Sequence, residues 1–271
     1  MRGVIQHCRA LIVLGLSGGS LAVGSALAHE PQPQSPSVPE HSPTLLGAGV
    51  YAIPVYPGSG AVELTPVPFM DIAWNRLFVQ SAYGAGIYLW QKPSSDAGIS
   101  IDADPSHRYE ADASRLSGLG NVHKTARANV FITERCAWMD TTAKLSTDIG
   151  GEGHGSVVDI ELAKSHSLTA KLGVRAGVGT TWTNAHYMRT FFGVDAQQSA
   201  RSGLPTFSPD SGFSSARLFF SAQYAVRPHW LVSGQTYVGR LRGDAADSPI
   251  TQKRNYVGGG VFLAYVVRPK S

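Results

Sequence analysis

The stretch Leu168–Val178, LTAKLGVRAGV, changes character at every position. Its even-numbered residues are all apolar, and its odd-numbered residues are polar, charged or glycine. Neighbouring side chains of a β-strand point to opposite faces, so this stretch presents one apolar face and one polar face. Lys171 and Arg175 lie on the polar face. The pattern predicts a strand over residues 168–182.

The same period of two recurs along most of the chain. Over residues 122–134, 137–149 and 156–164, apolar residues alternate with Arg, Asn, Asp, Lys and Glu. Eleven segments are candidate strands: 46–56, 62–73, 77–90, 97–104, 122–134, 137–149, 156–164, 168–182, 214–226, 229–241 and 255–267. Bacterial single-chain barrels have an even number of strands, so we expect about twelve, with ten as the fallback. The division into strands is least clear between Val62 and Trp90.

Short and long connections alternate between these segments. The shortest lie at 135–136, 165–167 and 227–229, and the longest at 105–121, 183–212 and 242–253. Strands of this length with short turns at one end and long loops at the other are typical of an outer-membrane barrel. A secreted β-sandwich also alternates, but its strands are about half as long. Six aromatic residues suit the interfacial girdles of a barrel: Trp138, Trp182, Tyr224, Trp230, Tyr237 and Tyr256.

The composition agrees with an all-β protein. Only 15% of the 271 residues are charged, and the chain has 30 Gly and 2 Cys. These values argue against a coiled coil, a charged disordered chain and a disulfide scaffold. No segment after the N-terminal region has the ~20 apolar residues that a membrane helix needs. The fold we expect is a transmembrane antiparallel β-barrel.

The N-terminal region is typical of an exported protein. A basic start, the apolar run 10–16 and the small-residue end at Ala26–Ala28 predict a signal peptide over 1–28. The Pro-rich residues 29–44 are expected to form a flexible periplasmic lead-in, and 45–271 the barrel. We therefore expect the outer membrane of a Gram-negative bacterium, in contact with its lipid. The signal accounts for two of the four net positive charges, and no basic run indicates nucleic-acid binding.

The polar faces of neighbouring strands bring charges into the predicted lumen. If the alternation holds, six charged residues line it: Asp140, Lys144, Asp159, Glu161, Lys171 and Arg175. These opposite charges can pair as a structural plug or line a small channel. A barrel of this size has limited free lumen, which favours the plug.

The sequence has no motif that indicates an enzyme. Ser59 does not stand in a Gly-x-Ser-x-Gly elbow, and no two histidines have zinc-ligand spacing. His154 lies in a predicted external loop near Glu152 and Asp148, where an ordinary loop histidine is the default. We expect no catalytic, metal-binding or cofactor-binding residue and no cofactor. A barrel hydrolase assembled from distant strands ranks last among the alternatives.

Several phrases at loop edges resemble the MipA/OmpV family of outer-membrane proteins. They are Tyr56–Ser59 with Pro66–Pro68, Arg115–Asn121, Tyr187–Val194 with Ser202–Pro205, and Leu241–Pro249. They recur in order over roughly residues 45–267. One departure is the C-terminus, because the family typically ends on an aromatic residue and this chain ends Arg268-Pro269-Lys270-Ser271.

The resemblance implies a role in peptidoglycan growth. The family's named member is a scaffold that joins a lytic transglycosylase to a murein-synthesising penicillin-binding protein. The resemblance therefore implies a scaffold with these two partners, without a residue-level binding site. A small outer-membrane channel for small solutes is the alternative. Both hypotheses place the protein in the outer membrane, and a shared fold alone does not separate them.

Overall fold

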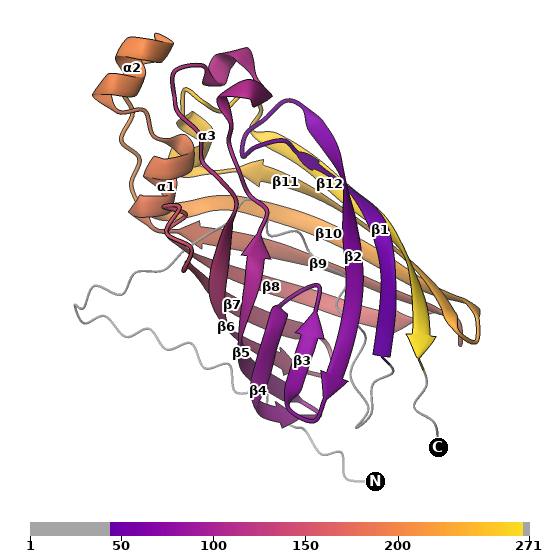
Figure 1. Ribbon diagram of the computed structural model, residues 1–271. Helices are drawn as coiled ribbons and strands as arrows, with labels where there is room; N and C mark the ends of the chain where they lie inside the picture. The colour runs from indigo at the N-terminus through magenta and orange to yellow at the C-terminus, as the bar shows by residue number, and fades with distance from the viewer. Residues whose placement is uncertain (1–43, 268–271) are drawn as a thin grey trace.

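The computed structural model describes residues 44–267 of the chain. The predicted signal peptide, residues 29–43 of the lead-in and residues 268–271 lie outside this range. The described residues form twelve strands, which close into one barrel (Figure 1). Each strand is antiparallel to its neighbours in the chain, and β12 pairs with β1. The predicted all-β barrel of about twelve strands is confirmed.

The strands of the barrel range from short to long. The first six are β1 (Thr44–Pro54), β2 (Val62–Trp74), β3 (Leu77–Gln80), β4 (Gly84–Lys92), β5 (Ser95–Asp104) and β6 (Thr125–Arg135). The others are β7 (Asp140–Asp148), β8 (Ser156–Ser167), β9 (Leu172–Thr183), β10 (Gly212–Arg227), β11 (Trp230–Leu241) and β12 (Asn255–Val267).

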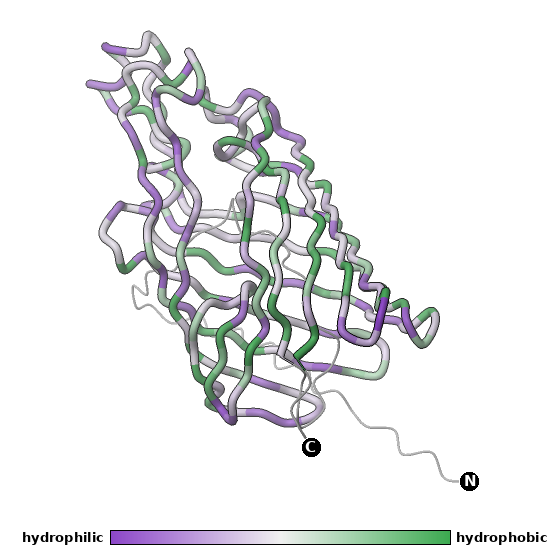
Figure 2. The backbone as a smooth tube through the Cα atoms, turned by 45° about the vertical axis from the view of Figure 1, so that its right-hand side comes forward, coloured by the Kyte–Doolittle hydropathy of each residue, from purple (hydrophilic) through white to green (hydrophobic). Residues whose placement is uncertain are grey.

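The barrel has its polar side chains inside and its apolar side chains outside. On β6, Val130 is 52% and Ile132 is 46% exposed, whereas Arg127 and Asn129 on the opposite face are buried. Hydrophobic positions recur along the strands in Figure 2. A soluble sandwich buries its apolar face, whereas a membrane barrel turns that face to lipid. This arrangement rules out the sandwich alternative.

The twelfth strand comes from the segment 77–90, which the alternation predicted as one strand. It is two strands, β3 and β4, joined by a turn at 81–83. Gly84 follows this turn with a φ of +76°, a left-handed conformation that favours glycine. Residues on both sides of the turn are apolar, so the alternation alone did not show the reversal.

The strand predicted over 168–182 begins four residues later, because residues 168–171 form a turn. The hydroxyl of Thr169 accepts hydrogen bonds from the backbone N–H of Lys171 (3.1 Å) and Leu172 (3.0 Å). A threonine side chain that binds the backbone in this way stabilises a turn. The alternation of apolar residues continues through the turn by coincidence.

The short β3 leaves one strand edge open in the wall. β2 pairs with β3 only from Asp71 to Trp74, so residues 62–69 have β1 as their only partner strand in the described chain. Pro66 and Pro68 are exposed in this segment. The carbonyl of Pro68 points to the open side, where it accepts from the Ser81 hydroxyl. Prolines on this side remove N–H donors that would pair with another chain.

We expect the double variant Pro66→Val/Pro68→Val to associate edge to edge. It restores two backbone N–H donors on an open strand edge, which is a template for pairing. Size-exclusion chromatography in detergent should show a dimer peak that grows with protein concentration. The exposed prolines Pro93 and Pro205 lie outside the strands, so Pro93→Val/Pro205→Val is the control. Equal elution of the two double variants would contradict the role of the prolines.

The long connections gather at one end of the barrel. They contain η1 (Glu110–Asp112), η2 (Ser114–Leu116), α1 (Ala185–Phe192), α2 (Ala196–Ser202) and α3 (Gly243–Asp247). The described chain ends lie at the opposite end, with the short turns (Figure 1). Long loops are extracellular and short turns periplasmic in such barrels. None of the helices in residues 44–267 is long and apolar enough to span a membrane.

Candidate functional site

The lumen is built around Arg217, which β10 places between two carboxylates of β8. Its Nη1 lies 3.2 Å from Asp159 Oδ1, and its Nη2 lies 2.8 Å from Glu161 Oε1. The Thr181 hydroxyl donates to the same Asp159 oxygen at 2.7 Å. The three charged side chains are between 4% and 9% exposed. One arginine therefore holds two buried carboxylates in a fixed arrangement.

A second arginine extends this group along β9. Arg175 Nη2 lies 3.5 Å from Glu161 Oε2, so Glu161 is shared between two guanidinium groups. The Arg175 guanidinium also lies 4.9 Å from the centre of the Phe219 ring. A guanidinium over an aromatic face is stabilised by the ring's quadrupole. The ion pair with Glu161 and the contact with Phe219 together fix the Arg175 side chain.

Further ion pairs continue around the wall of the lumen. Lys144 Nζ lies 3.9 Å from Asp102 Oδ2, and Lys144 faces Asp159 across the β7–β8 pair. Arg135 pairs with Asp96 nearer the periplasmic end. Isolated buried charges are very costly, so pairing is the condition for keeping them inside. The inward charges are thus arranged in neighbouring groups of opposite sign.

The burial of these charged side chains indicates a filled lumen. The side chains of Lys144 and Arg217 are 3% and 4% exposed. A residue that lines an open aqueous pore is in contact with water, whereas these side chains are enclosed by protein atoms. Opening a pathway past them would require breaking buried ion pairs, which costs several kcal/mol each by the usual magnitudes. The geometry corresponds to a plug made of side chains.

The structure brings four of the six predicted lumen residues together. Lys144, Asp159, Glu161 and Arg175 are buried in the network. Asp140 lies at the periplasmic end of the same inward face, partly exposed, with the Ser165 hydroxyl 3.5 Å from its Oδ2.

Lys171 is the exception. It does not face the lumen, because it lies exposed in the turn between β8 and β9. Its position in the alternation matches the inward face of β9, but Lys171 precedes the first residue of that strand.

Several residues of the network were not among the predicted site residues. The most central is Arg217, and Arg127, Asp96, Asp102 and Asp104 also point inward. All five belong to the polar positions of alternating strands, so the signal was present in the parity of the sequence. The parity does not show which charges pair, because Arg217 binds carboxylates that are 58 and 56 residues away in the chain.

A buried histidine closes the extracellular end of the network. His154 Nδ1 lies 2.5 Å from Asp104 Oδ2, and its Nε2 lies 2.6 Å from the His123 carbonyl oxygen. Asp104 also pairs with Arg127. His154 is 0% exposed. It is thus an anchor between two loops and the barrel rim, whereas the sequence suggested an ordinary loop histidine.

The same cluster contains a serine, but its order differs from that of a hydrolase. The Ser106 hydroxyl donates to Asp104 Oδ1 at 2.6 Å, and both ring nitrogens of His154 are engaged by other groups. Nucleophilic catalysis needs a serine bound to its general base. Here the carboxylate lies between serine and histidine, which gives a structural hydrogen-bond cluster. No group of three potential metal ligands was found within residues 44–267.

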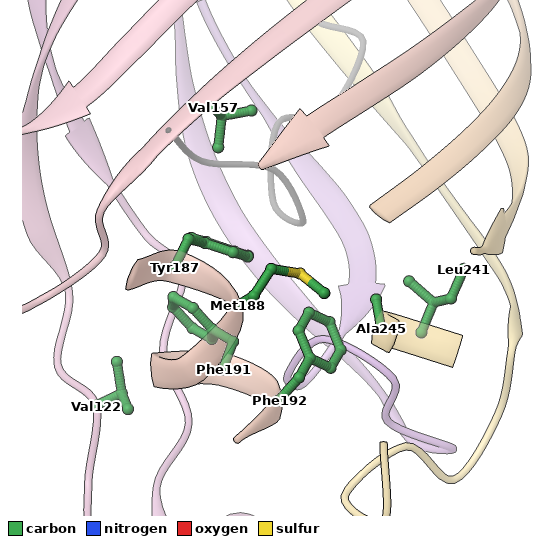
Figure 3. Packing of buried hydrophobic residues seen from close by; sticks show 8 residues of the cluster. All are labelled: Val122, Val157, Tyr187, Met188, Phe191, Phe192, Leu241 and Ala245. Carbon is green, nitrogen blue, oxygen red and sulfur yellow. The ribbon is translucent and has the colours of Figure 1, made fainter. Parts of the chain in front are cut away.

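Helix α1 packs against this polar cluster and belongs to a cluster of apolar side chains, which Figure 3 shows. Its buried residues Tyr187, Met188, Phe191 and Phe192 pack with Val122, Val157, Leu241 and Ala245 from other connections and strands. The helix begins at an Asn184 cap, whose side chain accepts from the Tyr187 N–H at 2.9 Å. Phe191 stacks on Tyr187 and presents its ring to His154 at 4.9 Å. This apolar cluster therefore separates the polar network from the extracellular side.

A buried arginine links helix α1 to the loop before β6. Arg108 Nη2 donates to the Thr190 carbonyl oxygen at 3.2 Å. Burial lowers the pKa of Arg108 to about 10. A charged side chain enclosed in this way depends on the surrounding loops staying in place. The extracellular loops thus form one packed cap.

The periplasmic end exposes aromatic residues. Trp138 is 66% exposed in the turn between β6 and β7, and Trp230 is 40% exposed at the start of β11. Of the six predicted girdle residues, Tyr237 does not belong to a girdle, because it is 6% exposed and packs inside the barrel. Tyr256 also turns inward, against Tyr237. Both stand at inward positions, where a tyrosine fills the lumen.

These features define a closed outer-membrane-type β-barrel whose interior is filled and charged. Residues 46–267 match the family described as MltA-interacting protein MipA, and the chain belongs to this family. The predicted family resemblance is thereby confirmed.

Individual proteins show the same relationship. The chain is 25% identical over 210 residues to the MltA-interacting protein of Escherichia coli (strain K12), covering 77% of this chain and 84% of that protein. The MltA-interacting protein of Shigella flexneri matches equally. Among solved structures, the CymD monoaromatic hydrocarbon channel has a TM-score of 0.40 at 10% identity, covering 84% of this chain and 89% of that one. The Pseudomonas putida toluene transporter TodX has a TM-score of 0.36 at 10% identity, with the same coverage.

Proposed function

We propose that this protein is an outer-membrane scaffold that binds a lytic transglycosylase and a murein-synthesising penicillin-binding protein in the periplasm. The observation that carries the proposal is the filled lumen, because a barrel whose interior is occupied by buried ion pairs offers a rigid platform. The relatives from Escherichia coli and Shigella flexneri are named for an interaction with MltA. The name supports a transglycosylase as the first partner.

The partners would dock on the periplasmic turns, because murein enzymes act on that side of the membrane. Two neighbouring turns expose apolar side chains there, with Trp138 66% and Leu168 55% exposed. Lys164 Nζ donates to the Ala137 carbonyl oxygen at 2.5 Å, which ties the first turn to β8. Exposed tryptophan on a fixed turn is a typical interface anchor. We therefore place the docking surface on the turns 136–139 and 168–171.

We expect Trp138→Ala/Leu168→Ala to lower co-purification of the transglycosylase after crosslinking by at least about tenfold, the usual consequence of losing an anchor residue. The measurement is crosslinking in intact cells, followed by purification of the barrel and quantification of both enzymes. Trp182→Ala is the matched control, because Trp182 lies near the extracellular end of β9. Each variant must keep the heat-modifiable gel band of a folded barrel.

Two results would contradict the scaffold. One is the repeated absence of both enzymes from crosslinked wild-type protein. The other is steady single-channel conductance of the purified barrel in planar bilayers, which would show an open pathway and support the small-channel alternative.

A further inference from the structure

A groove of about 920 Å³ lies on the outer surface of the barrel near its extracellular end. Its floor consists of outward-facing aliphatic side chains from five consecutive strands, Ile160, Val178, Leu218, Val238 and Val257. Each of them is more than a third exposed. Neighbouring strands are about 4.8 Å apart, so this floor is several acyl chains wide. The surface is thus apolar and broad.

Three basic residues form the rim of the groove. They are Arg240 at the end of β11, Arg242 just beyond it, and Lys253 before β12. The loop between β1 and β2 is held against this rim, since Gly58 O accepts from the backbone N–H of Lys253 at 3.0 Å. The rim is therefore a fixed part of the fold.

These three cations have no anionic partner among residues 44–267. All three are exposed, and none has a side-chain hydrogen bond or ion pair to any residue of 44–267. The described residues that line the groove include neither Asp nor Glu. The neighbouring Arg254, outside the groove, is by contrast paired with Asp247 at 2.7 Å. The groove thus combines unneutralised positive charge with an apolar floor.

We propose that this groove binds a lipid of the outer leaflet that has a multiply phosphorylated head group and several acyl chains, as in the lipid A part of lipopolysaccharide. The acyl chains would lie on the aliphatic floor, and the phosphates would be bound by Arg240, Arg242 and Lys253. Arginine binds phosphate oxygens through paired N–H donors, and lysine acts as a point charge. Three cations match more than the single charge of a phosphatidylglycerol head group.

The position of the rim agrees with this ligand. Arg242 and Lys253 belong to the long loop between β11 and β12, which marks the extracellular side. Lipid head groups of the outer leaflet lie at that level. The proposal is independent of the scaffold role, which concerns the opposite end of the barrel.

The test measures lipid retained by the purified barrel in a non-ionic detergent. Native mass spectrometry would count lipid A bound to the wild type and to Arg240→Gln/Arg242→Gln/Lys253→Gln. The control variant is Arg76→Gln/Lys171→Gln/Arg227→Gln, which removes three exposed cations at the periplasmic end. We expect the rim variant to lose at least about tenfold in affinity, because each cation near a lipid surface contributes to binding. The control should bind as the wild type does.

Two further arms test the chemistry. Dephosphorylated lipid A and phosphatidylglycerol should each bind the wild type more weakly than lipid A. Val238→Trp places a large side chain on the floor without changing the rim, and should also weaken binding. All variants must retain the heat-modifiable band. Equal retention by the rim variant and the wild type would overturn the proposal, as would equal binding of the dephosphorylated lipid.

Discussion

Arg217→Met lowers the free energy of unfolding of the barrel by about 3–5 kcal/mol, the usual cost of removing one partner from a buried ion pair. The substitution keeps the unbranched aliphatic part of the side chain but deprives Asp159 and Glu161 of their shared guanidinium. Asp159 loses the hydrogen bond from Arg217 Nη1 and retains the one from the Thr181 hydroxyl. Urea unfolding in lipid vesicles, followed by loss of the heat-modifiable band, measures the change.

A second variant separates charge from packing. In Arg217→Met/Asp159→Asn one orphaned carboxylate is neutralised, while Glu161 keeps Arg175. The double variant should therefore regain more than half of the lost stability. Lys171→Met is the matched control, because this cation lies in an exposed turn and its loss should change stability by less than about 0.5 kcal/mol. If Arg217→Met and Lys171→Met unfold alike, the lumen network does not stabilise the fold.

Phe191→Ala destabilises the extracellular cap by about 3–5 kcal/mol while leaving the barrel closed. Phe191 is 0% exposed, stacks on Tyr187 at 4.5 Å and contacts His154 edge-on at 4.9 Å. Its truncation leaves a cavity between the helix and the polar cluster. The cap packs on the rim through side chains, so it can open without breaking strand pairs.

Limited proteolysis of outer-membrane vesicles measures this opening. Cleavage within residues 184–211 should become at least about tenfold faster, because proteolysis follows the population of the open form. The heat-modifiable band should persist. His186→Ala is the control on the same helix, since His186 is exposed. Loss of the band in Phe191→Ala would show instead that cap and barrel unfold together.

Local patterns in the sequence were sufficient for the class of fold. Alternation along segments such as 122–134 records which side chains meet lipid and which meet the lumen, because a strand has a period of two. The inward positions of Lys144, Glu161 and Arg175 follow from the same rule. These inferences need no knowledge of where other strands lie.

The errors have a common physical origin. Alternation does not stop at a turn when the turn residues happen to fit it, so 168–171 and 81–83 were assigned to strands. Similarly, Tyr237 was predicted for the girdle from its residue type, but its position in the alternation directs its side chain into the lumen. In each case a local signal was compatible with two structures, and contacts outside the segment selected one.

By itself, therefore, the sequence determined that the chain forms a barrel, which face of the clearly alternating strands turns inward, and to which family it belongs. The tertiary structure alone decided what the inward charges do. Arg217 joins two carboxylates of a distant strand, His154 reaches Asp104 across 50 residues, and Arg240, Arg242 and Lys253 meet above one groove. The reason is that parity depends on neighbours in the chain, whereas charge pairing depends on strand register and closure.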